Sequence, residues 1–135
     1  MKRSIFKDKK WIIFAIFIVL IILFVIVIGS GLQEKKKEMA EIQKIESEYN
    51  GEFADDSVLI VTTKERHELN KEYKLNEFPE IELESIEVLM EAEDGDILGL
   101  HLKKPSRQNV LKAVYRLRNN PIVLHCEVNG INSIY

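Results

Sequence analysis

The 135-residue sequence has a single cysteine, Cys126, and carries none of the familiar catalytic or cofactor motifs. One cysteine excludes an intramolecular disulfide. The sequence has no glycine-rich phosphate loop and no Ser, His and Asp in a catalytic order, so neither nucleotide chemistry nor acyl transfer is indicated. We therefore expect a protein that is not an enzyme, needs no cofactor and takes no small-molecule substrate.

Metal ligands are also scarce. The three histidines, His67, His101 and His125, are scattered, and only His125 has a neighbouring ligand type, Cys126. Neighbours in a strand point to opposite faces, so this pair is a poor metal site. Cys126 has no basic partner nearby in sequence, which favours a small buried residue over a nucleophile. The segment 93–96 is a thin version of a calcium loop, and we expect no metal.

Basic residues are few in the larger part of the chain. Of 19 basic and 22 acidic residues, five basic and one acidic precede residue 11, which leaves 14 and 21 after it, a net charge of −7. Nucleic-acid binding needs clustered lysine and arginine, so this composition argues against a nucleic-acid partner. The nine acids between Glu77 and Asp96 are interpreted mainly as the solvated side of a strand.

The longest feature present is an apolar run, WIIFAIFIVLIILFVIVI, from Trp11 to Ile28. As a helix with about 1.5 Å rise per residue, it would span roughly the hydrocarbon core of a bilayer. The pattern predicts a basic tail over 1–10 and a single transmembrane helix over 11–29.

Five basic residues precede the run, whereas the cluster Lys35 to Lys37 behind it is diluted by Glu34 and Glu38. The positive-inside rule then predicts a cytoplasmic N-terminus and an extracytoplasmic C-terminal domain in the cell membrane. A cleaved signal peptide ending near Gly29-Ser30-Gly31 is the competing interpretation. The run is longer than a usual signal-peptide core, which favours an uncleaved signal-anchor.

Residues 30–54 are predicted to form a charged helical spacer. Met39, Ile42, Ile45 and Tyr49 are spaced three and four apart, which gives one narrow apolar stripe on an otherwise solvated helix. We expect a spacer that contributes no core residues to the following domain. The alternative is a coiled-coil seam that pairs with another membrane protein.

Residues 55–129 are predicted to form an α+β domain in the order β-α-β-β-α-β. Val58 to Val61 is an apolar strand, and Thr62 with Glu65 has the spacing of a capping box for a helix that continues to about Tyr73. Two further strands and a second helix follow from the alternating and helical periodicities. Their expected positions are strands near 86–90, 98–102 and 122–127 and a helix from about Pro105 to Arg118. This order is typical of a ferredoxin-like fold with both helices on one face of an antiparallel sheet.

Two predicted strands, Val58–Val61 and Ile122–Leu124, are apolar on both faces. Helices would cover only one face, so the other face exposes an apolar patch or buries it against a partner. This favours a protein-binding sheet face over an inert spacer domain.

The segment VLKAVYRLRNNPIVLHCEVN, residues 110–129, resembles the end of subtilase propeptides and related stand-alone protease inhibitors. Pro121, Val123, Glu127 and Asn129 match that pattern, while Cys126 replaces a usual alanine and Val128 a frequent proline. The resemblance covers roughly Asp56 to Asn129, and its specific part is about twenty residues.

The resemblance implies that the uncovered sheet face lies on a subtilisin-like protease, with the C-terminal tail in the cleft. It identifies Glu127 as a carboxylate that caps helices of the enzyme. It assigns tail contacts to residues 130–135, chiefly Asn132, Ser133, Ile134 and Tyr135. The sequence thus leaves two hypotheses: an inhibitor or folding helper of such a protease, and a structural subunit of a bacterial cell-envelope complex.

Overall fold

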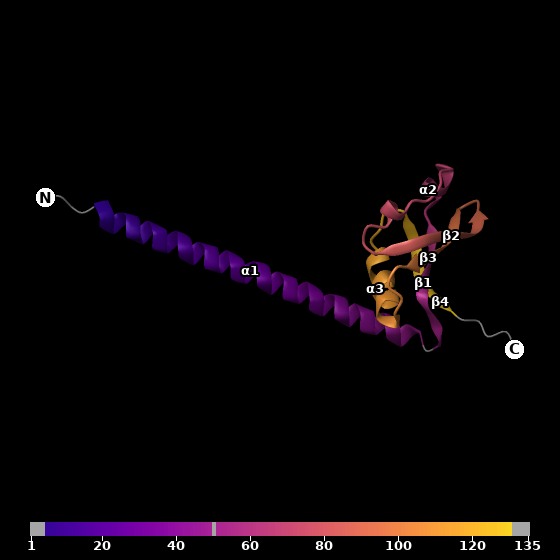
Figure 1. Cartoon of the computed structure of the whole chain (residues 1–135), viewed down its shortest axis with the longest axis horizontal. Helices are drawn as coiled ribbons and strands as arrows, with labels where there is room; N and C mark the ends of the chain where they lie inside the picture. Colours follow the sequence, from indigo (N-terminus) through magenta and orange to yellow (C-terminus); the bar gives the residue numbers. More distant parts are fainter. Residues whose placement is uncertain (1–4, 50, 131–135) are drawn as a thin grey trace. The chain divides into compact units, whose positions relative to one another are not determined.

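The computed structural model describes residues 5–49 and 51–130 of the chain. Its elements, drawn in Figure 1, form two compact units, Met1–Ala40 and Glu41–Tyr135. The helices and strands are α1 (Ile5–Glu48), β1 (Phe53–Thr62), α2 (Lys64–Glu68), the 3-10 helix η1 (Leu75–Glu77), β2 (Leu83–Ala92), β3 (Gly95–Leu102), α3 (Arg107–Leu117) and β4 (Val123–Gly130).

The predicted apolar helix, residues 11–29, lies within the longer helix α1. An 18-residue window of α1 has a mean hydropathy of 3.7, and none of it is buried by other parts of the protein. A helix whose whole circumference is apolar has no polar face to present to water. α1 is therefore long and apolar enough to be a candidate membrane-spanning helix near the N-terminus.

The second unit is an α+β domain built on one four-stranded antiparallel sheet, as predicted. The strands lie in the order β2-β3-β1-β4, and every neighbouring pair is antiparallel. The strands are longer than the sequence patterns indicated. β1 begins at Phe53 instead of near Ser57, and β2 extends from Leu83 to Ala92.

One face of the sheet is covered by α3, as Figure 1 shows. Ser106 caps the helix, because its hydroxyl accepts a hydrogen bond from the Asn109 backbone amide over 3.0 Å. The apolar side of α3 packs on alternate residues of the strands. The buried core there includes Val110, Val114 and Leu117 from α3, Val58 and Ile60 from β1, and Leu98 and Leu100 from β3.

The expectation that the spacer contributes no core residues is wrong. Ile42 and Ile45 belong to the same buried cluster as the α3 residues, and Ile45 is completely buried. Tyr49 packs against this cluster as well. The part of the apolar stripe from Ile42 to Tyr49 therefore belongs to the domain core, and Ile42 and Ile45 are not available for a coiled-coil partner.

The first helix of the domain is also shorter than predicted. α2 ends at Glu68, and Tyr73 lies beyond it. The cap is Thr63 instead of Thr62, and its hydroxyl accepts a hydrogen bond from the Arg66 amide over 3.3 Å. Asn70 has a φ of 46°, a left-handed conformation that cannot continue a helix.

The turn between β2 and β3 is the one predicted at Asp94-Gly95. Gly95 has a φ of 147°, a conformation that residues with a side chain rarely adopt. A Cβ atom there would overlap the carbonyl group of Thr62. Glycine is thus required for β3 to pass close to the end of β1.

Candidate functional site: the uncovered face of the sheet

The face of the sheet that points away from α3 is here called the outer face. Side chains alternate along a strand, so the residues between the buried core positions point to this side. The pairing of the strands aligns them in three cross-strand rows. The first row contains Ser85, His101 and Ser57, the second Glu87, Gly99, Leu59 and Glu127, and the third Met90, Ile97, Val61 and His125.

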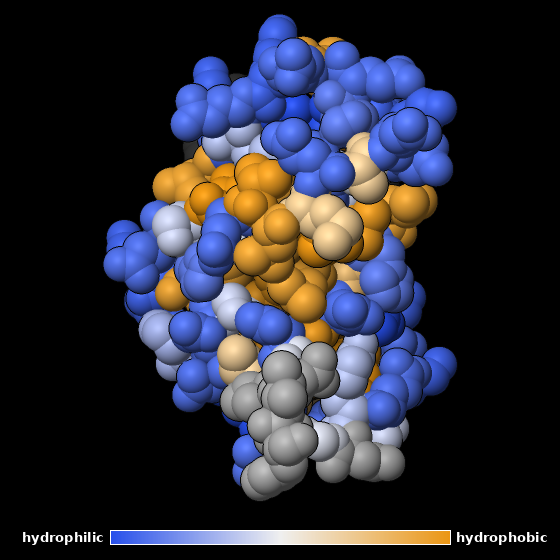
Figure 2. Space-filling view, turned by 90° about the vertical axis from the view of Figure 1, so that its right-hand side faces the viewer, coloured by the Kyte–Doolittle hydropathy of each residue, from blue (hydrophilic) through white to orange (hydrophobic). Residues whose placement is uncertain are grey.

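The centre of the outer face is apolar. Leu59, Val61 and Ile97 are each partly exposed, and Met90 is 57% exposed. Figure 2 looks onto this side of the domain and shows a continuous apolar area bordered by hydrophilic side chains. An uncovered apolar area of this kind, with a polar rim, is typical of a binding surface.

An irregularity in β2 adds a further apolar side chain to this surface. The pairing with β3 shifts between Val88 and Met90, so Leu89 is an extra residue in β2. Its side chain lies over Gly99, with Cδ1 3.6 Å from the position that a Cβ atom would occupy. The sequence suggested a bulge or a close approach at Gly99, and the structure shows the approach at Gly99 and the irregularity in β2.

Charged groups lie at both sides of the apolar centre. Nε2 of His101 lies 3.2 Å from Oε2 of Glu87, and Nε2 of His125 lies 3.3 Å from Oε2 of Glu127. The carboxylates are well exposed, so they remain accessible to a partner. Exposed pairs of this type contribute little to folding stability.

Glu127, predicted from the resemblance as a contact residue, therefore lies on the outer face at its β4 side. The other predicted contacts, Asn132, Ser133, Ile134 and Tyr135, lie outside the described residues. The alternation of polar and apolar residues indicated the outer face in general. It gave no signal for the row that joins Glu87 to Glu127, because that row depends on the strand register.

A polar cluster lies elsewhere in the domain, between α2, β1 and β3. Asp96 accepts a hydrogen bond from the Tyr73 hydroxyl and contacts Nδ1 of His67 at 2.8 Å, and its backbone amide donates to Thr62 Oγ1 over 2.9 Å. Burial, together with the bond to Asp96, raises the pKa of the Tyr73 hydroxyl. The carboxylate and imidazole resemble part of a catalytic triad. The contacts of Asp96 with His67 and Tyr73 join the α2 region to the sheet, and we interpret them as structural.

Arg66 and Glu77 continue this cluster. The two side chains form a paired hydrogen bond, and the Arg66 guanidinium lies over the Tyr73 ring, 4.1 Å from its centroid. The hydrogen bond from Arg66 holds the pKa of Glu77 below its usual range. No buried side-chain polar atom among the described residues lacks a hydrogen-bond partner, so the cluster has no orphaned group to offer a ligand.

Cys126 is buried under the covered side of β4, in accordance with the prediction that it is a small interior residue. Burial raises the pKa of its thiol to about 12. The thiolate needed for nucleophilic attack or metal binding is therefore scarce at neutral pH. Within residues 5–49 and 51–130, no cluster of three histidine, cysteine or carboxylate side chains could hold a metal ion.

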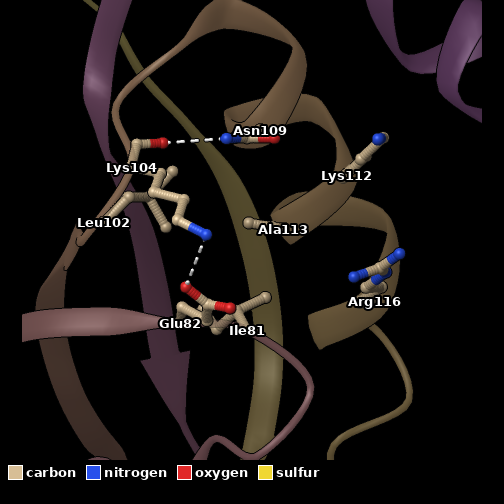
Figure 3. Close-up of a pocket in the computed structure, with 8 residues that line it drawn as sticks. All are labelled: Ile81, Glu82, Leu102, Lys104, Asn109, Lys112, Ala113 and Arg116. Carbon is tan, nitrogen blue, oxygen red and sulfur yellow. Dashed lines mark hydrogen bonds and ion pairs between the residues drawn. The ribbon is translucent and has the colours of Figure 1, made fainter.

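A pocket of about 240 Å³ lies between α3 and the segment before β2. Figure 3 shows Ala113 and Ile81 on its apolar walls, with Glu82 and Lys104 facing one another. The Lys104 ammonium lies 3.5 Å from Glu82 Oε2, so this cation is already paired with an acid. The charged end of Lys112 extends away from that pair.

No protein-family model matches the chain, and the comparisons with curated proteins and with solved structures find no significant match.

Proposed function

We propose that this protein is a membrane-anchored module that binds another protein through the outer face of its sheet. The main support is the uncovered apolar centre of the outer face. It is made by Leu59, Val61 and Ile97, with Leu89 and Met90 beside it. Burying such a surface against a partner is favourable by about 25 cal/mol per Å². The domain offers no comparable arrangement for catalysis among its described residues.

The anchor is α1, and the proposed orientation has the N-terminus in the cytoplasm and the domain outside. The five basic residues before Trp11 support it, because cytoplasmic flanks are enriched in lysine and arginine. Protease added to intact cells would then digest the domain. Digestion only after permeabilisation would mean the inverse orientation.

We further propose that the domain is ferredoxin-like. The strand order β2-β3-β1-β4, with helical connections after β1 and β3, supports this assignment. So does the coverage of a single face by α3. A ferredoxin-like domain leaves its second sheet face free, which is the face that carries the apolar centre here.

A subtilisin-like protease is the proposed partner, on the basis of the resemblance of residues 110–129 to subtilase propeptides. The exposed position of Glu127 on the outer face supports this choice, because a contact carboxylate must be accessible. The domain would act as an inhibitor or folding helper. A structural subunit of an envelope complex remains the alternative, and it would use the same sheet face, since Ile42 and Ile45 are buried.

The binding proposal is tested by purification of the full chain from native membranes. A Leu59→Asp variant should lose its co-purifying protein, because the carboxylate would be buried against the partner. Leu69→Asp is a matched control, since Leu69 is 56% exposed and lies at the end of α2. Equal recovery of a partner by both variants would contradict the proposal.

The choice of partner is tested by titration of a broad-specificity subtilisin with the full chain in detergent. Inhibition that is weakened by Leu59→Asp and unaffected by Leu69→Asp would support a protease partner. Absence of inhibition at high micromolar concentration would remove the protease and leave the envelope-complex alternative.

A further inference from the structure

The arrangement of charge around the outer face restricts the kind of partner that fits it. We propose that the bound segment carries apolar side chains bracketed on both sides by lysine or arginine. This inference rests on the proposed function, because it names the chemistry of the partner for the same sheet face.

The restriction comes from one cross-strand row. Glu87 pairs with Gly99, Gly99 with Leu59, and Leu59 with Glu127, so the row runs straight across all four strands. Its two ends are carboxylates, and they are separated by three strand spacings. At about 4.8 Å per spacing, the backbone positions of the two acids lie roughly 14 Å apart.

Between these ends the row is apolar. Leu59 provides one side chain, and Leu89 covers the position where Gly99 has none. The neighbouring row continues this surface with Met90, Ile97 and Val61. A partner that buries the apolar centre must therefore bring groups of its own close to both carboxylates.

The three rows contain no lysine or arginine in the part of the chain that the structure describes. Within the rows, the hydrogen-bond partners of the two acids are the imidazoles of His101 and His125. Side-chain exposures of 60% for Glu87 and 48% for Glu127 leave both carboxylates accessible for further hydrogen bonds. A neutral or acidic partner would partly desolvate these carboxylates without compensation, whereas lysine or arginine would form charge-assisted hydrogen bonds.

Charge farther from the face acts in the same direction. Residues from 32 onward carry 14 basic and 21 acidic side chains, so a basic segment is attracted to the domain before contact.

The distance between Glu87 and Glu127 also sets the spacing of the basic residues in the partner. About 14 Å corresponds to about nine residues of a helix, or about four of an extended segment.

The test uses the full chain in nanodiscs of phosphatidylcholine, a lipid without net charge that does not itself attract basic peptides. A phage-displayed library of random 14-residue peptides is selected on these discs after removal of peptides that bind empty discs. Affinities of the enriched peptides are then measured by fluorescence anisotropy. Three variants are compared with the wild type. The first is the double variant Glu87→Lys/Glu127→Lys, and its matched control is the double variant Glu52→Lys/Glu93→Lys. The third is the single variant Leu59→Asp.

We expect enriched peptides with apolar residues bracketed by lysine or arginine, and loss of binding to Leu59→Asp. Reversal of both row acids should weaken binding about tenfold, because two ion pairs become repulsive contacts. The control makes the same change in net charge at exposed acids outside the rows and should stay within about twofold. A larger loss of affinity in the row variant than in the control would show direct contact with Glu87 and Glu127, because general charge attraction would weaken both variants equally.

Two results would overturn the inference in different ways. Peptides that need Leu59 but lack basic residues, or that bind the row variant as well as the control, would refute the basic partner and leave the sheet face as a binding site. A selection that yields no peptide sensitive to Leu59→Asp would refute both the inference and the proposed binding function.

Discussion

The buried Arg66 and the partly exposed Glu77 form an ion pair that organises the segment between α2 and β2. Arg66 Nε lies 2.6 Å from Glu77 Oε1, and Nη2 lies 3.0 Å from Oε2. The same guanidinium donates to the backbone carbonyls of Lys71 and Glu72 over 3.2 Å each. One arginine, only 5% exposed, thus holds together the segment that joins α2 to η1, in which residues 69–74 form no helix or strand.

Replacement of Glu77 by glutamine should destabilise the domain by about 3 kcal/mol, because Arg66 would be left buried without its counter-charge. Hydrogen exchange of the β1 and β3 amides in the full chain measures this free energy. Glu68→Gln is the control, since its pair with Lys64 is exposed and worth well under 1 kcal/mol. Equal losses in the two variants would mean that the Arg66 pair has no special role.

The same pair predicts a loss of stability in acid. The pKa of Glu77 is lower in the folded domain than in the unfolded chain, because Arg66 donates to its carboxylate. Its stabilising contribution is therefore complete above the unfolded pKa of about 4.3 and is lost as pH falls through the lower folded pKa. Unfolding followed by hydrogen exchange between pH 5 and 2.5 should show a shallower decline in Glu77→Gln than in the wild type.

Ile45 provides a test of where the domain begins. Ile45→Ala should cost about 3 kcal/mol, since the side chain is fully buried in the core cluster. Met39→Ala is the control, because Met39 is 61% exposed on the same helix. The free energy of unfolding of both variants is measured by urea unfolding of the full chain in nanodiscs, with protease resistance of the domain as the readout. A stable Ile45→Ala variant would restore the spacer interpretation.

Gly95 and Gly99 lie on the same strand and should respond differently to alanine. Gly95→Ala should cost at least about 2 kcal/mol, because the new Cβ overlaps the Thr62 carbonyl group and the φ of 147° is strained. Gly99→Ala should be nearly neutral, because its Cβ meets Leu89 at an ordinary 3.6 Å. Thermal unfolding of the two variants compares them directly, and similar melting temperatures would contradict this account of the turn.

Strong local patterns predicted most of the elements. The apolar run, the alternation in β2 and β3, the Asp94-Gly95 turn and the amphipathic α3 all depend on the residue order within one segment. Each was confirmed as an element. The bounds of the strands and of α3 moved by a few residues, whereas the apolar run lies within the much longer α1. Strand ends moved because pairing with neighbours, which no local pattern records, extends β1 to Phe53 and β4 to Gly130.

The errors concern residues whose role depends on distant partners. The stripe that includes Ile42 and Ile45 predicted an apolar helix side correctly, but spacing cannot tell which surface covers that side. Glu77 was counted among nine solvated acids, although it binds a buried arginine eleven residues before it. The outer-face row from Glu87 to Glu127 joins residues forty positions apart and needed the strand register to be seen.

Site-specific photo-cross-linking in the native membrane tests the central claim most directly. A photoreactive residue replaces Leu59 at the centre of the outer face, and in a second variant replaces Leu69 at the end of α2. We predict a protein adduct of defined mass from position 59 and none from position 69, because only the outer face is proposed to be covered by a partner. Equal adducts from both positions, or none from position 59, would contradict protein binding through this face.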